Sequence, residues 1–417
     1  MMKNNKKILF VHQNFPAQYK HISIALSDLG YEVHSLSISE YSNDKIKSHS
    51  YKLLSLSSEG INQWAVEFET KMIRAESAAK KAFELKDNGF YPDLIIGHPG
   101  WGDTFFLKEV WPDTKMLSYV EFYYKTTDCD IDFDKNFVRN ILEEDFEYFH
   151  TRNKFKLTAR NAPFLASYST SDFLVCPTEY QKSLVPESLK NNINVIHDGI
   201  DTNTLKPNED ININIKGKKF TKKDKIITYI SRSLDPYRGF HIFMESLPMI
   251  LKSNPDAYVF ILGNKNTHGY GAPSQKGSFK DIFYGSIQND IDSSRVFFLD
   301  TLEYSSYIKV IQITSAHIYL TYPFVLSWSL LEAMSCGALI IGSKTEPVTE
   351  VIQDNKNGLL VDFFDSKMIT KTITKVLNNR QKYENIRKNA RKTIVEKYDL
   401  NNICLPAHIE LIKKALK

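Results

Sequence analysis

Tyr322-Pro-Phe-Val-Leu-Ser-Trp-Ser-Leu-Leu-Glu332-Ala-Met-Ser-Cys-Gly337 begins where residues 316–322, an apolar run typical of a buried β-strand, come to an end. The stretch predicts a short turn, a helix over residues 327–335, a stop at Gly337 and another strand. A helix that begins directly after a strand points free backbone N–H groups and its positive dipole end at the sheet edge, which favours an anion such as phosphate. Glu332 lies about one and a half turns into this helix, where it could accept hydrogen bonds from a pair of sugar hydroxyls.

A second anion-binding element is predicted earlier in the same half of the chain. Residues 225–230 predict a strand and residues 240–251 a helix, and the loop between them holds Arg232, Arg238 and Gly239. Two arginines in such a loop suit a diphosphate, because each guanidinium is a rigid fork of donors that stays charged. The alternative is an ordinary pair of surface arginines. Together, the arginine loop and the N-terminus of the helix over residues 327–335 predict a site that holds one diphosphate from two sides.

The totals favour an ordinary globular protein of two domains. A chain of 417 residues exceeds what one hydrophobic core usually organises. A net charge of +4 does not argue for a nucleic-acid partner. The apolar run behind the basic start ends at Val11, too short for a signal peptide, and the sequence has no membrane-span-length apolar window. The four scattered cysteines fit buried thiols, so we expect a cytoplasmic protein, or one peripheral on the inner face of the membrane.

The first half opens with a Rossmann-like pattern. Residues 6–11 predict a strand, residues 19–29 a helix and residues 31–36 a second strand. The loop between the first strand and the helix has no G-x-G-x-x-G, which argues against a dinucleotide bound there.

Polar side chains follow two later strands of this half. His98 and Trp101 come directly after the strand predicted within residues 91–97, and Glu121 follows residues 115–120. In an open parallel sheet, ligands bind at the carboxyl ends of the strands. His98 is the strongest candidate here, although a loop histidine satisfied by backbone groups is the alternative, and Glu121 could orient an acceptor hydroxyl.

Two charged clusters in the first half have several interpretations. Aspartates alternate through one loop, at Asp128, Asp130, Asp132 and Asp134. We expect a solvated loop or an acceptor contact there and no metal site, because such a site needs a strand end beside the bound phosphates, whereas this run lies in a loop of the other half of the chain. A basic group follows, made of Arg152, Lys154, Lys156 and Arg160. It could meet an anionic acceptor or lipid head group, or be plain surface.

Residues 323–342 resemble the donor-binding segment of the retaining glycosyltransferases of family 4, which have the GT-B fold. In that family a Glu, seven residues and a second Glu precede Ala-Met and a Gly; Glu332 matches the second Glu and Phe324 stands in place of the first. Arg232 and Arg238-Gly239 match the family's Gly-Arg and Lys-Gly pattern, with Arg for Lys. Ala17-Gln18 stands where many members have Gly-Gly.

The resemblance implies an α/β fold of two Rossmann-like domains that face each other across a cleft. Its boundaries would be residues 1–210 for the acceptor domain, 211–390 for the donor domain and 391–417 for a helix that crosses back, with a linker in the lysine-rich residues 208–225. The catalytic residues it implies are His98, Arg232 and Arg238. The donor-binding residues are Gly239, Thr301, Leu302, Phe324, Leu326, Ser327, Trp328, Ser329, Leu330 and Glu332. The acceptor residues are Gln18, Trp101 and Glu121.

The activity implied is transfer of a hexosyl group, with retention, from a UDP- or GDP-linked sugar to a hydroxyl of a glycan, glycolipid or glycoprotein in bacterial surface-polysaccharide biosynthesis. Neither a metal nor another cofactor is expected. Two alternatives stay open: a nucleotide-sugar epimerase on the same fold, and a non-catalytic partner subunit. Phe324 and Ala17-Gln18 are the departures that keep the second alternative open.

Overall fold

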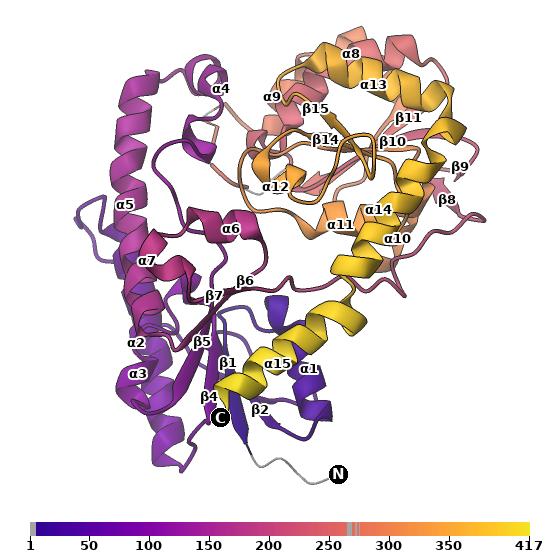
Figure 1. The fold of residues 1–417 in the computed structure, drawn as a ribbon. Helices are drawn as coiled ribbons and strands as arrows, with labels where there is room; N and C mark the ends of the chain where they lie inside the picture. The colour runs from indigo at the N-terminus through magenta and orange to yellow at the C-terminus, as the bar shows by residue number, and fades with distance from the viewer. Residues whose placement is uncertain (1–5, 265–268, 272, 275) are drawn as a thin grey trace. The chain divides into compact units, whose positions relative to one another are not determined.

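The computed structural model describes residues 6–264, 269–271, 273–274 and 276–417, which divide into two compact units (Figure 1). Unit 1 comprises Met1–Thr126, Thr151–Gly199 and Asn401–Lys417. Unit 2 comprises Thr127–His150 and Ile200–Leu400. Each unit is built on its own parallel sheet with helices on both faces.

Unit 1 has a seven-stranded parallel sheet in the order β3-β2-β1-β4-β5-β6-β7. Its strands are β1 (Lys7–Val11), β2 (Glu32–Ser37), β3 (Lys47–Ser50), β4 (Leu94–Gly97), β5 (Lys115–Tyr119), β6 (Phe173–Cys176) and β7 (Ile193–Val195). Its helices are α1 (Lys20–Asp28), α2 (Val66–Asp87), α3 (Leu107–Val110), most of α5 (Phe146–Thr170), α6 (Glu179–Leu184), α7 (Glu187–Lys190) and α15 (Leu405–Ala415).

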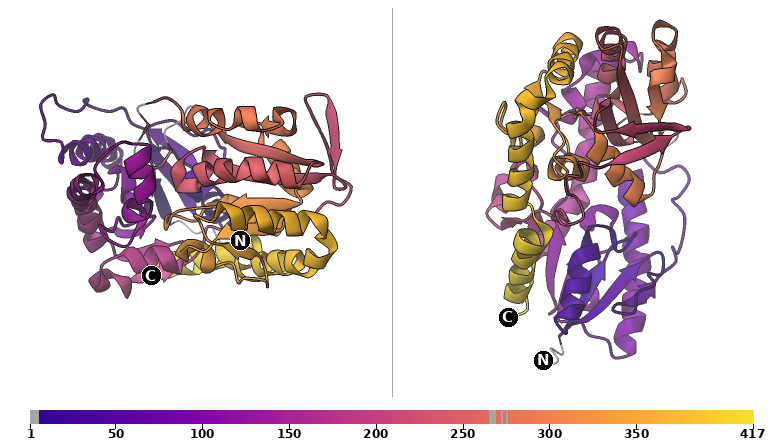
Figure 2. Two further views of the ribbon diagram at one scale, coloured as in Figure 1. Left: turned by 90° about the horizontal axis from the view of Figure 1, so that it is seen from above. Right: turned by 90° about the vertical axis from the view of Figure 1, so that its right-hand side faces the viewer.

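The two faces of this sheet follow from the alternation of side chains along β1. Ile8 and Phe10 pack in the core with α1 and α15, whereas Leu9 and Val11 pack in the core with α2 and α3. Because both faces are covered, the strand is apolar from Ile8 to Val11, as parallel strands usually are. Figure 2 shows the strands of unit 1 between the yellow helix α15 and the long purple helices.

Unit 2 has a six-stranded parallel sheet in the order β12-β11-β10-β13-β14-β15. Its strands are β10 (Lys225–Ser233), β11 (Ala257–Asn264), β12 (Val296–Phe298), β13 (Ala316–Tyr319), β14 (Ile340–Ser343) and β15 (Leu359–Val361). Helices α8 (Phe240–Ser253) and α13 (Ser366–Asn378) share one core with the sheet. Helices α10 (Tyr304–Ile313), α11 (Trp328–Ser335) and α14 (Glu384–Lys397) share the other. The remaining helices are α4 (Lys135–Asn140), α9 (Phe279–Gly285) and α12 (Glu346–Thr349).

The residues expected to hold the linker, 208–225, contain a hairpin that belongs to unit 2. Strands β8 (Asn212–Ile215) and β9 (Lys218–Thr221) pair antiparallel. Lys216 and Gly217 between them both have positive φ, at 52° and 79°, as a tight hairpin turn requires. Ile213 and Phe220 are buried in the core beside the sheet. Apolar residues alternate with polar ones here, and the many lysines obscure that period in the sequence.

The aspartate-rich loop also differs from its prediction. Residues 127–150 belong to unit 2, although they lie in sequence between strands of unit 1. Asp134 is buried, and its Oδ2 accepts from the Tyr322 hydroxyl at 2.8 Å and faces His241 Nε2 at 2.9 Å. Phe133 packs against the rings of Tyr322 and Phe363. The loop is therefore only partly solvated: Asp130 and Asp134 are buried and Asp128 is exposed, because the aromatic residues fix the loop to unit 2.

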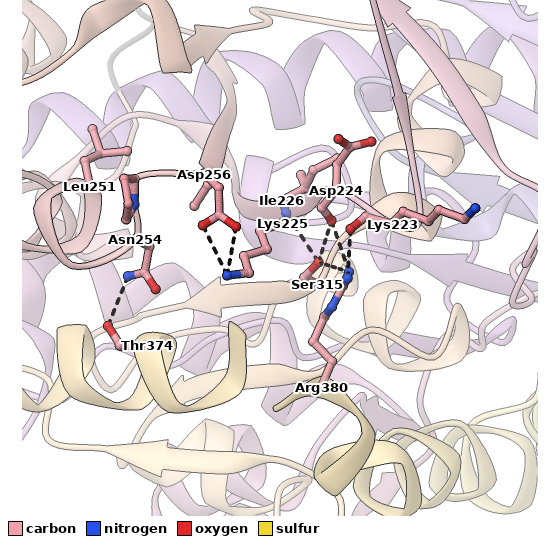
Figure 3. A network of polar contacts seen from close by, with 12 residues as sticks. Lys223, Asp224, Lys225, Ile226, Leu251, Asn254, Asp256, Ser315, Thr374 and Arg380 are labelled. Atoms are coloured by element: carbon pink, nitrogen blue, oxygen red, sulfur yellow. Dashed lines mark hydrogen bonds and ion pairs between the residues drawn. The ribbon is translucent and has the colours of Figure 1, made fainter. Parts of the chain in front are cut away.

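Arg380 joins the C-terminal part of unit 2 to the start of β10 (Figure 3). Its Nη1 donates to the carbonyl oxygens of Lys222 at 2.8 Å and Asp224 at 3.1 Å, and to Ser315 Oγ at 3.2 Å. Its Nη2 donates to the Lys223 carbonyl at 2.8 Å. One guanidinium thus satisfies backbone acceptors that lie just before the strand. Within the described ranges, helices long and apolar enough to cross a membrane are absent.

Candidate functional site

Arg238 lies at the N-terminus of α11 in unit 2. Its Nη1 donates to the Val325 carbonyl at 2.9 Å and lies 3.4 Å from the Tyr319 hydroxyl, which accepts from the Ser327 backbone N–H at 2.8 Å. The Ser327 side chain caps the helix by accepting from Ser329 N–H. A guanidinium that is always charged and the positive end of a helix therefore converge. Together they could hold a diphosphate.

The other two predicted residues of this loop occupy different positions. Arg232 is exposed near the end of β10, and no hydrogen bond to it occurs within the described ranges. Gly239 has φ +69°, and a Cβ added there would lie 2.4 Å from Leu320 Cβ. Glycine is therefore needed for the backbone turn and for close packing against the end of β13.

Glu332 is held by two tyrosines that the sequence reasoning missed. The Tyr304 hydroxyl donates to Glu332 Oε1 at 3.0 Å, and the Tyr307 hydroxyl donates to Oε2 in a short hydrogen bond. Burial raises the pKa of the Glu332 carboxyl, and the two tyrosine hydrogen bonds oppose that rise. Thr301 and Leu302 come directly before α10, which carries both tyrosines. The sequence signal that could have identified these tyrosines is their i, i+3 spacing at the start of a helix, which places both on one face.

The remaining donor-side residues divide between core and surface. Phe324 is 3% exposed and belongs to an aromatic cluster, with ring centroids 4.5 Å from Tyr270 and 5.4 Å from Tyr237. Leu330 is fully buried, and Leu326 packs against the same core. Trp328 is 45% exposed at the first turn of α11, beside the buried cap partner Ser329. The aromatic cluster occupies the place where the family pattern has a carboxylate.

In unit 1 the structure brings His98 and Glu121 together at the carboxyl ends of β4 and β5. His98 Nδ1 accepts from Gly100 N–H at 3.0 Å, so its Nε2 carries the proton and faces Glu121 Oε2 at 3.3 Å. The His98 ring stacks on Tyr119 with centroids 5.6 Å apart. His98 is buried, whereas the Glu121 side chain is 52% exposed. The pair could orient a hydroxyl group.

His12 is a further member of this group that the sequence reasoning missed. Its ring lies edge-on to His98 with centroids 5.4 Å apart, and it follows β1 at the same sheet edge. Burial, together with the smaller effect of the neighbouring His98, lowers the pKa of His12 to about 3. His12 is therefore neutral near pH 7. Its position directly after the first strand was the signal that could have identified it.

Gln18 lines a small cavity beside this group. The cavity has a volume of about 30 Å³, enough for a water molecule, and its walls include Tyr19, Tyr119, Asp198 and His408. The Tyr119 hydroxyl donates to Asp198 at 3.0 Å. Gln18 Nε2 is buried with no hydrogen-bond partner among the described residues. Trp101 lies on the loop after β4 and is 39% exposed.

The described residues hold no group of three or more His, Cys, Asp or Glu side chains placed to bind a metal ion. The four cysteines are buried as thiols, as the sequence predicted.

Comparisons with known proteins assign a family description to each half. Residues 31–205 match the model described as glycosyl transferase family 4 group, and residues 210–393 match glycosyl transferases group 1. An uncharacterized glycosyltransferase of Methanocaldococcus jannaschii is 24% identical over 266 residues, which are 62% of this chain and 61% of that relative. The chain thus spans less than two thirds of that relative's length.

Solved structures share the fold at low sequence identity. Sucrose-phosphate synthase from Thermosynechococcus elongatus has a TM-score of 0.72 at 12% identity, over 98% of this chain and 99% of that one. Anabaena HepE, in complex with UDP and glucose, has a TM-score of 0.63 at 15% identity, over 98% of this chain and 100% of that one. With the two parallel sheets, these likenesses confirm the GT-B fold.

Proposed function

This chain pairs a glycosyltransferase family 4 group domain with a group 1 domain on the GT-B fold, and from that premise we propose that it transfers a sugar from a nucleotide-sugar to a hydroxyl. The observation that carries the proposal is the arrangement in unit 2, where Arg238 meets the N-terminus of α11 and Glu332 lies further along the same helix. Arg238 and the N-terminus of α11 would hold the diphosphate, and the Glu332 carboxylate would accept hydrogen bonds from the ribose hydroxyls. Anabaena HepE was solved with UDP, which favours a uridine nucleotide here.

Arg238 and the helix dipole would also stabilise the leaving group. When the sugar departs, negative charge develops on the diphosphate, and a fixed guanidinium and helix end stabilise that charge without reorganising. The leaving phosphate would accept the proton of the acceptor hydroxyl, so the sugar is transferred with retention and without a metal. His98 and Glu121 in unit 1 would orient the acceptor.

The acceptor we propose is a bacterial surface glycan, glycolipid or glycoprotein. The protein would bind it in the cytoplasm or at the inner face of the membrane. The basic side chains of Arg152, Lys154 and Lys156 on α5, with the exposed Phe155 among them, support peripheral contact with anionic lipid.

Calorimetric titration of UDP, GDP, ADP and CMP into the wild type and two variants tests the donor site. We expect one diphosphate to bind, and Glu332→Gln to weaken it about tenfold or more, because hydrogen bonds to a charged group typically contribute about 1.5–3 kcal/mol. Glu303→Gln is the matched control, since Glu303 is an exposed carboxylate just before α10. Equal binding by both variants would contradict the role of Glu332.

A non-catalytic subunit on the same fold is the second candidate, and the burial of Phe324 in its aromatic cluster favours it. Binding of no nucleotide would support this candidate. Conversion of a bound nucleotide-sugar without any acceptor would instead support an epimerase.

A further inference from the structure

A cluster of cations in unit 1 holds more positive charge than its neighbours neutralise. Glu67, Lys71 and Arg74 lie on one face of α2 at positions i, i+4 and i+7, and Arg160 on α5 joins them. Arg160 Nε donates to Glu67 Oε2 at 2.7 Å, and Lys71 Nζ lies 3.3 Å from Glu67 Oε1. One carboxylate therefore serves two cations. Arg74 has no ion pair within the described ranges.

Asp103, a carboxyl group on which the charge of Arg74 acts, is poorly suited to balance that charge. Asp103 is fully buried; burial raises its pKa, which favours the neutral acid. Its Oδ1 accepts from the Tyr51 hydroxyl, and its Oδ2 has no partner in the described chain. Although burial opposes ionisation of Glu67, the charges of Arg160 and Lys71 hold its pKa below the ordinary value. Three cations thus face one ionised carboxylate.

The Lys71 ammonium is a buried charge that its surroundings balance only in part. Its side chain is 5% exposed, and Nζ lies 4.1 Å above the ring centroid of Phe164. The ammonium has no partner with hydrogen-bond geometry among the described residues. Burial lowers the pKa of Lys71, and the ion pair with Glu67 opposes that shift. Because Glu67 is shared with Arg160, the buried ammonium is short of acceptors, and an added anion would supply one.

Arg74 connects the cluster to Trp101, one of the residues predicted to contact the acceptor. Its Nε is buried without a hydrogen-bond partner in the described part of the chain, and its guanidinium carbon lies 5.8 Å from the ring of Trp101, which is 39% exposed. The next residue, Gly102, has φ +100°, and a Cβ added there would lie 2.3 Å from the Lys71 carbonyl oxygen. The loop that begins with His98 therefore lies directly on α2 at the cluster.

We propose that Lys71, Arg74 and Arg160 form a binding site for an oxyanion, phosphate or carboxylate, that belongs to the acceptor. The interpretation of the anion as part of the acceptor rests on the proposed sugar transfer. Arginine suits this role, because its planar fork makes two parallel hydrogen bonds to either group. The anion would pair with Arg74 and satisfy the Lys71 ammonium, while the open face of Trp101 would contact the attached sugar. The acceptor would then be an acidic or phosphorylated glycan.

Titration of inorganic pyrophosphate and, separately, of glucuronate into the wild type, Arg74→Gln and Lys80→Gln tests the site. Lys80 is the matched control, because it is an exposed cation on the same helix. We expect Lys80→Gln to bind as the wild type does and Arg74→Gln to bind one anion about tenfold more weakly. Binding of an anion at the diphosphate site of unit 2 should have the same affinity in Arg74→Gln and in Lys80→Gln, because both substitutions lie in unit 1. Dependence of pyrophosphate binding on Arg74 indicates a phosphorylated acceptor, and dependence of glucuronate binding indicates an acidic sugar.

Equal affinities of Arg74→Gln and Lys80→Gln for both anions would overturn the proposal and leave Arg74 as a structural partner of Trp101. Thermal unfolding without anions checks that each variant is folded. Should Arg74→Gln not fold, Arg74→Lys replaces it, and we expect intermediate affinity because the charge stays while the fork is lost. UDP binding by the wild type separates the two proposals: if UDP binds and the anions show no Arg74 dependence, only the acceptor site fails.

Discussion

At the scale of single residues, the carboxylate of Glu332 is positioned before any ligand arrives. Tyr304 and Tyr307 each donate to a different carboxylate oxygen. Each oxygen can accept a further hydrogen bond, so the tyrosines leave room for two ribose hydroxyls. Because the carboxyl is half-buried, the two donors favour its ionised form against the effect of burial.

We therefore expect Tyr307→Phe to weaken UDP binding about three- to tenfold near pH 7, the usual range for one lost hydrogen bond. The ionised carboxylate is the better acceptor, so affinity should fall as the pH falls through the raised pKa of Glu332. Removing the Tyr307 hydroxyl raises that pKa further, so the fall should begin at higher pH in the variant. Calorimetric titration across the pH range measures both effects.

Tyr258→Phe is the control for this experiment, because the Tyr258 hydroxyl accepts from Lys218 Nζ on the hairpin strand β9. A pH profile of Tyr307→Phe that overlies the wild-type profile would show that the tyrosine only supports the fold.

At the same scale, the sequence singled out Glu332 and Arg238 as candidates but did not indicate their partners. Both lie in strand–loop–helix units whose order is local, so their spacing could be read along the chain. Tyr304 reaches Glu332 across 28 positions, and Tyr319 reaches Arg238 across 81. Such contacts depend on which helices the sheet brings together, and a single sequence does not specify that.

At the scale of elements, local signals predicted the helix of the central stretch well. Residues 327–335 were expected, and α11 spans Trp328–Ser335, because the Ser327 cap and the stop at Gly337, with φ +73°, are set by adjacent residues. The edge strand β3 and the β8–β9 hairpin were not predicted. Strand β3 has no apolar residue, and the few apolar residues of β8 and β9 lie among asparagines and lysines, so burial of Ile213 and Phe220 is a tertiary effect.

Arg380 provides a test of how one element is fixed to another. Arg380→Ala leaves three backbone carbonyls and Ser315 without this donor, so we expect the free energy of unfolding of the chain to fall by about 2–4 kcal/mol. Arg380→Lys should recover only a small part, since an ammonium cannot reproduce the fork. Denaturant unfolding followed by circular dichroism measures the change.

Lys388→Ala is the matched control for Arg380, because Lys388 makes only an exposed ion pair with Glu384 at 3.5 Å. Its effect should stay within about 0.5 kcal/mol. A similar loss in both variants would mean that the Arg380 contacts add nothing specific.

At the scale of the whole molecule, buried histidines make stability depend on pH. Burial lowers the pKa of His12 and His317 to about 3, and that of His49, His197 and His408 to about 4. An unfolded chain protonates each of them near pH 6.5. Below that pH the unfolded state binds more protons than the folded state, so stability falls as the pH drops from about 6.5 toward 4.

We expect each such histidine to contribute about 1.4 kcal/mol per pH unit to that slope. His317 is the best single test, because it is fully buried on β13 and its Nδ1 faces Thr228 Oγ1 at 2.8 Å. His317→Gln should reduce the slope of unfolding free energy against pH by about that amount, whatever its effect at pH 7. An unchanged slope would show that His317 takes up its proton without unfolding.

The allocation of residues 127–150 to unit 2 also affects how the molecule is made. The chain enters and leaves each unit more than once, and the helix α15 that covers one face of the unit 1 sheet is synthesised after all of unit 2. A ribosome that has released residues 1–200 has therefore not yet supplied Leu411 and Ile412, which complete that face. Unit 2 has all its residues by Leu400, so its sequence is complete before that of unit 1, and neither unit can be produced intact as one continuous fragment.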